Sequence, residues 1–176
     1  MASTTVEMRK REAESDARSQ NADTVQEKPI PVNRTAVNIA LLSVRLIVGA
    51  IFMMHGAQKV FGAYGGPGLS QMMSGDMGPV LGFLVAIGEF FGGLGIAVGF
   101  LARFSALANI VIMLGAIFMV HGKNGFFMSE KGFEYNLALI GLLLPVFIMG
   151  SGDWQIGRFL PLPGVRETGK PIPALE

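Results

Sequence analysis

Residues 79–101 read PVLGFLVAIGEFFGGLGIAVGFL, an apolar stretch that carries a single carboxylate, Glu89, near its middle. At about 1.5 Å per residue, a helix of this length crosses a hydrocarbon core of roughly 30 Å and places Glu89 near the middle of a bilayer. A carboxylate at that depth needs a partner or a proton. The rest of the sequence must supply one of the two.

The composition is that of a membrane protein. The chain has 176 residues, of which 51% are hydrophobic and 15% are charged, whereas soluble domains carry roughly 25% charged residues. Its net charge of +1 gives no indication of nucleic acid binding, because the basic residues are concentrated near the two ends. The chain contains no cysteine, which excludes disulfides and thiolate metal sites within it.

Three further apolar stretches predict spanning helices, at about residues 37–61, 104–120 and 134–150. Only residues 99–103 separate the second helix from the third, and so short a connection makes the two antiparallel neighbours. We therefore predict an all-α fold, a membrane four-helix bundle with antiparallel up-down-up-down topology over residues 36–160.

The segments outside the predicted bundle are polar. Residues 1–35 carry many charges and no aromatic residue, which predicts a disordered or partly helical N-terminal tail. Residues 161–176 form a predicted C-terminal tail. Basic residues are more frequent in the two tails and at Arg103 than in the loops on the other side, so both termini are predicted to be cytoplasmic.

Arg45 is the predicted partner of Glu89. Arg45 lies roughly 12 Å inside the cytoplasmic end of the first helix, and Glu89 lies roughly 15 Å inside the outer end of the second. In a core of about 30 Å their backbones then differ by only about 3 Å in height. We predict a structural ion pair between Arg45 and Glu89 that fixes the register of the helices, and we keep a proton-carrier role for Glu89 as the alternative.

A second polar cluster is predicted at the outer end of the bundle, from His55, Lys59, His121 and Glu134 on three different helices. The cluster predicts binding of a quinone head group, with His55, His121 and Glu89 as proton carriers. The competing interpretation is that these are interfacial side chains reaching toward water. A bis-histidine haem between His55 and His121 is the weaker possibility, because no other haem signature is present. No metal site is predicted.

The chain resembles the DoxX family of small bacterial membrane proteins. The resemblance covers roughly residues 37–160. It rests on these residues: Arg45-Leu46, His55-Gly56-Ala57-Gln58-Lys59-Val60-Phe61-Gly62, Gly88-Glu89-Phe90-Phe91-Gly92-Gly93-Leu94, Gly99, Arg103, His121, Gly125-Phe126-Phe127, Glu134-Tyr135 and the closing residues 150–154.

The resemblance implies a four-helix bundle in the bacterial cytoplasmic (inner) membrane. The family takes its name from the small subunit of a quinone-linked thiosulfate oxidoreductase, so the leading hypothesis is an integral membrane subunit associated with quinone-linked oxidoreduction. The lipid bilayer, a partner subunit or a second copy of the chain are the expected partners. Two alternatives stay open: a non-enzymatic accessory or scaffold subunit, and a small proton-coupled transporter. Whether the chain is itself catalytic is left open.

Overall fold

The structure is a computed structural model that describes residues 7–8, 10–11, 13–16 and 33–155. The described residues of the N-terminal segment are helical and belong to a separate compact unit. The predicted C-terminal tail, residues 161–176, lies outside the described residues, as does most of the predicted N-terminal tail. The fold described below is that of residues 33–155.

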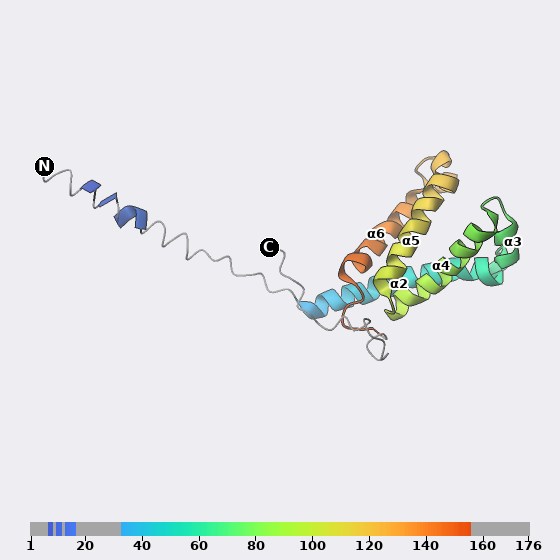
Figure 1. The fold of residues 1–176 in the computed structure, drawn as a ribbon, viewed down its shortest axis with the longest axis horizontal. Helices are drawn as coiled ribbons and strands as arrows, with labels where there is room; N and C mark the ends of the chain where they lie inside the picture. Colours follow the sequence, from blue (N-terminus) through green and yellow to red (C-terminus); the bar gives the residue numbers. More distant parts are fainter. Residues whose placement is uncertain (1–6, 9, 12, 17–32, 156–176) are drawn as a thin grey trace. The chain divides into compact units, whose positions relative to one another are not determined.

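The part of the chain that the structure describes consists of helices joined by turns and short loops, and it contains no strand. Four long helices account for the four apolar stretches, and one short helix lies between the first two (Figure 1). They are α2 (Arg34–Phe61), α3 (Gly68–Ser74), α4 (Gly78–Val98), α5 (Ala102–Ala116) and α6 (Glu134–Met149). The predicted helix boundaries are therefore correct to within a few residues.

Three segments are long and apolar enough to cross a membrane: α2, α4 and residues 102–124. The third consists of α5, a π-helical turn at Ile117–His121 and a short turn at Gly122–Asn124, rather than one regular α-helix. At 16 residues, α6 is apolar but shorter. The apolar length of these helices places the chain in a lipid bilayer.

The ends of the helices follow local rules. At the start of α2, the side chain of Asn33 accepts a hydrogen bond from the Ala36 N–H at 3.1 Å, which satisfies a donor that the helix itself leaves free. At its end, Gly62 adopts φ +69°, a left-handed conformation that favours glycine. Gly99 ends α4 in the same way, with φ +76°.

Glycines bring α2 and α4 close together. A Cβ atom built on Gly49 would lie 2.8 Å from the Gly93 carbonyl oxygen, and one built on Gly56 would lie 2.3 Å from the Phe90 nitrogen. The backbones of the two helices are thus in direct contact, which small residues allow in membrane bundles.

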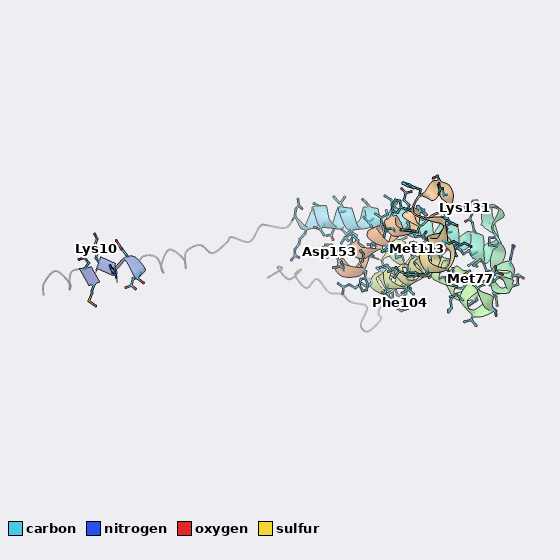
Figure 2. The ribbon with its side chains drawn as sticks, turned by 90° about the horizontal axis from the view of Figure 1, so that it is seen from above. Lys10, Met77, Phe104, Met113, Lys131 and Asp153 are labelled. Atoms are coloured by element: carbon cyan, nitrogen blue, oxygen red, sulfur yellow. The ribbon has the colours of Figure 1, made fainter. Side chains whose placement is uncertain are left out.

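The other helices complete the bundle. α5 packs against α4 and α6, and the start of α2 lies against the turn that follows α6. Figure 1 shows α5 and α6 running as neighbours, and Figure 2 shows Met113 of α5 within the packed helices and Asp153 beside the first half of α2. Side chains of all four long helices form one apolar core, which includes Val48, Phe52, Ile96, Ala106 and Leu143.

α2 and α4 are displaced along their axes relative to each other. Gly56, near the end of α2, faces Phe90 in the middle of α4. The first turns of α4 instead pack against α3, where a Cβ on Gly82 would lie 2.0 Å from the Met72 carbonyl oxygen. The end of α2 is therefore level with the middle of α4, and this displacement sets which polar groups can meet.

The close contact at Gly56 predicts a position-specific cost of adding a methyl group. We expect Gly56→Ala to force α2 and α4 apart, because its Cβ would overlap the backbone of Phe90, and to destabilise the protein by about 2 kcal/mol or more. Thermal unfolding of the purified protein in detergent measures the effect.

Gly141→Ala is the matched control for this prediction. Gly141 also lies inside a helix, but a Cβ there meets no atom within 4 Å, so this substitution is expected to be neutral or to stabilise by about 0.5–1 kcal/mol. Equal melting temperatures for the two variants would contradict the packing described for α2 and α4.

Candidate functional site: polar groups between the helices

Lys59 and Glu89 form an ion pair between α2 and α4, from Nζ to Oε2, and it is the only ion pair within the described residues. The Glu89 side chain is 5% exposed and the Lys59 side chain is 24% exposed. Lys59 follows Gly56 by about one helical turn, so the close approach at Gly56 carries the ammonium group against α4. Glu89 is thus paired with Lys59, and part of the Lys59 side chain remains exposed.

The predicted ion pair between Arg45 and Glu89 is wrong. Arg45 contacts the end of α4, about two turns beyond Glu89, whereas Glu89 pairs with Lys59. The prediction assumed that α2 and α4 begin and end at the same heights. Because the end of α2 is level with the middle of α4, Arg45 lies roughly 21 Å along α2 from the residue that meets Glu89.

Arg45 is buried, with 1% of its surface exposed, and it binds backbone carbonyl groups. Its Nε donates to the Ile96 carbonyl at 2.9 Å and its Nη2 to the Ala97 carbonyl at 3.0 Å. Its Nη1 donates to the carbonyls of Ser151 at 2.5 Å and Trp154 at 2.8 Å. We refer to these five residues as the Arg45 clamp.

The Arg45 clamp stabilises a buried cation without a carboxylate. Ile96 and Ala97 lie in the last turn of α4, where the helix dipole is negative and carbonyl groups can accept hydrogen bonds from outside the helix. The clamp also ties the turn after α6 to α4. Asn38 adds to this link, because it donates to the Asp153 carboxylate at 2.8 Å and accepts from the Asp153 N–H at 3.1 Å.

His55 lies against Tyr135, the second residue of α6. The centroids of the two rings are 6.3 Å apart and the ring planes are tilted by 59°. His55 precedes Lys59 by four residues on α2, so the two side chains lie on the same helix face. The structure therefore places these side chains in a row across three helices: Tyr135 on α6, then His55 and Lys59 on α2, then Glu89 on α4.

His121 and Glu134 have partners in the loop between α5 and α6. His121 Nδ1 lies 2.8 Å from the Lys131 carbonyl oxygen, and Glu134 Oε2 accepts from the Met128 N–H at 2.9 Å. Figure 1 shows this loop joining α5 to α6 at one end of the two helices. The predicted four-residue cluster is therefore divided: Lys59 pairs with Glu89, His55 contacts Tyr135, and His121 and Glu134 hold the loop.

Two parts of this arrangement were not predicted. Tyr135 belongs to the family resemblance but was not assigned to the polar cluster. Its position directly after Glu134, at the start of the predicted fourth helix, indicates that it lies at the same height as that cluster. The sequence cannot show which carbonyl groups bind Arg45, because every residue has a backbone carbonyl. Among the described residues, no group of three or more His, Cys, Asp or Glu side chains could hold a metal ion.

An all-helical chain with several apolar spans and a buried ion pair between two of them defines an integral membrane protein that crosses the bilayer more than once. The DoxX family model matches residues 40–122, a range that contains Arg45, Lys59 and Glu89. Inner membrane protein YqjF of Escherichia coli is 33% identical over 126 residues, which is 70% of this chain and 93% of YqjF. The chain belongs to the DoxX family and is a multi-pass inner membrane protein. No solved structure matches it significantly.

Proposed function

We propose that this protein is an integral membrane subunit of a quinone-linked oxidoreductase system and that it binds the quinone head group beside Lys59. The observation that carries the proposal is the Lys59–Glu89 pair, a cation and an acid held together inside a membrane protein with the cation partly exposed. Ionisable groups within membrane helices are costly and commonly serve substrate or proton pathways.

The groups around the pair fit a quinone head group. Within the described chain, the ring nitrogens of His55 and the hydroxyl of Tyr135 make no hydrogen bond, and Lys59 uses one of its three N–H groups for Glu89. Free donors beside apolar surface suit a ligand with a polar ring and an apolar tail. His55, Lys59 and Tyr135 are the residues that would hold the head group.

Quinone reduction takes up two electrons and two protons, and in this proposal the electrons come from a partner subunit. The contribution of this chain is to bind the head group and to hold protons near it. Lys59 carries an exchangeable proton beside an acid that can replace it, and the imidazole of His55 can both donate and accept a proton. His121 and Glu134 order the loop that closes the same end of the bundle.

The proposal predicts that quinone is retained by the purified protein. Lipid extracts of protein isolated in mild detergent are expected to contain quinone in a ratio approaching one per chain, measured by liquid chromatography and mass spectrometry. A His55→Ala variant is expected to lower membrane quinone reduction by at least about tenfold, because in this proposal His55 is the proton carrier beside the head group. A quinone-free extract together with unchanged reduction activity in the variant would contradict the proposal and favour the accessory or scaffold role.

We also propose the up-down-up-down topology with both termini cytoplasmic. It is supported by the concentration of basic residues at the two ends of the chain. Because the chain contains no cysteine, a single Glu130→Cys substitution in the loop before α6 reports its side of the membrane. We expect a membrane-impermeant maleimide to label this variant in intact spheroplasts, and labelling only after lysis would reverse the orientation.

A further inference from the structure

The Tyr135 hydroxyl has no hydrogen-bond partner among the described residues. The Tyr135 ring lies against His55. The side chain is half-buried, whereas His55 is exposed. An unpaired hydroxyl at the edge of a membrane bundle costs free energy unless water or a ligand supplies the missing bond.

Lys59 offers donors at the other end of the same surface. His55 lies between Lys59, one turn along α2, and Tyr135 on α6. Lys59 can only donate, and with one N–H on Glu89 it has two left. The surface thus presents a hydrogen-bond donor from α2 and one from α6, with an imidazole between them.

We propose that Tyr135 binds one ring oxygen of the quinone and that Lys59 makes the site prefer the oxidised form, an inference that rests on the proposed function. Its hydroxyl donates to one carbonyl oxygen of the ring while Lys59 donates to the other. The oxidised ligand, whose two ring oxygens only accept, is therefore bound more tightly than the quinol. The quinol presents its own O–H donors to an ammonium group that cannot accept them, and a donor left unpaired is costly.

The test compares both redox forms of a short-chain benzoquinone on the full-length protein in detergent, by isothermal titration calorimetry. The wild-type protein is expected to bind the quinone at least about tenfold more tightly than its quinol. Tyr135→Phe keeps the ring against His55 and removes only the hydroxyl. It is expected to weaken binding of both forms about three- to tenfold, as for the loss of one hydrogen bond, because a hydroxyl can donate to a quinone oxygen and can accept from a quinol O–H.

Tyr64→Phe is the control, because the only other tyrosine of the chain is 72% exposed in the turn after α2. It is expected to leave both affinities unchanged. Quinone binding without a preference for the oxidised form, or affinities that are unchanged in Tyr135→Phe, overturns this inference and leaves the proposed function standing. Binding of neither form to the wild-type protein overturns both.

Discussion

Replacing Arg45 with methionine is expected to destabilise the protein by about 3–5 kcal/mol, an effect comparable to removing one partner of a buried ionic interaction. The substitution removes the hydrogen bonds that Arg45 donates to four carbonyl oxygens of the Arg45 clamp. Within the described residues, only the Ile96 carbonyl of these four keeps another donor, the Gly99 N–H at 3.3 Å. Each buried acceptor that loses its hydrogen bond costs about 1–3 kcal/mol, and partial rearrangement keeps the total below the simple sum. Unfolding of the purified protein in detergent, followed by far-ultraviolet circular dichroism, measures the loss.

The matched control is Arg103→Met. Arg103 is exposed, so its polar interactions, which include a hydrogen bond to the Ile148 carbonyl at 3.2 Å, are screened by solvent, and its replacement is expected to cost no more than about 1 kcal/mol. Arg45→Lys should fall between the two, because one ammonium group cannot reach all four carbonyl groups that the planar guanidinium spans. Arg45→Met and Arg103→Met melting at the same temperature would show that the Arg45 clamp does not hold the bundle together.

Lys59→Met and Glu89→Leu are each expected to destabilise the protein by about 3–5 kcal/mol, because each leaves the other charge without its partner. The double variant Lys59→Met/Glu89→Leu is expected to recover most of this loss and to lie within about 1–2 kcal/mol of the wild type. Two apolar side chains of similar volume need no compensation inside a bilayer. A double-mutant cycle on unfolding in detergent yields the coupling energy between the two residues.

Glu89→Gln is the milder variant of the same pair. It keeps the shape and can still accept a hydrogen bond from Lys59, so it should destabilise less than Glu89→Leu and affect folding more than turnover. Strictly additive effects of Lys59→Met and Glu89→Leu would mean that the two residues do not interact. A stable, fully assembled but inactive Glu89→Gln protein would instead assign Glu89 a direct role in proton transfer.

The helical architecture could be predicted because its determinants are local. Apolar length identifies each spanning helix, and Gly62 and Gly99 mark the ends of α2 and α4 through left-handed conformations that favour glycine. The π-helical turn at Ile117–His121 was missed, since it depends on how α5 meets the following loop rather than on residue preference. The resemblance to the family rests on motifs along residues 37–160, and those on α2 and α4 lie against each other in the structure.

The polar pairing could not be predicted because it depends on the displacement of α2 relative to α4. Counting residues from the helix ends placed Arg45 beside Glu89, although α2 is 28 residues long, or about 42 Å, and extends beyond the last turn of α4. The glycine contacts at Gly49 and Gly56 fix the true register. The sequence shows these glycines but not which residues of α4 they face.

The central claim is that the Lys59–Glu89 pair forms part of a quinone site and is more than a structural link between helices. The most direct test uses the Lys59→Met/Glu89→Leu variant, which is expected to fold but lacks both charges. Wild type and variant are extracted from the same membranes in polymer nanodiscs, and quinone per chain is measured after circular dichroism confirms that both proteins are folded. We predict quinone near one per chain in the wild type and at least tenfold less in the variant. Equal quinone content in the two folded proteins would contradict the claim and reduce the pair to a structural link.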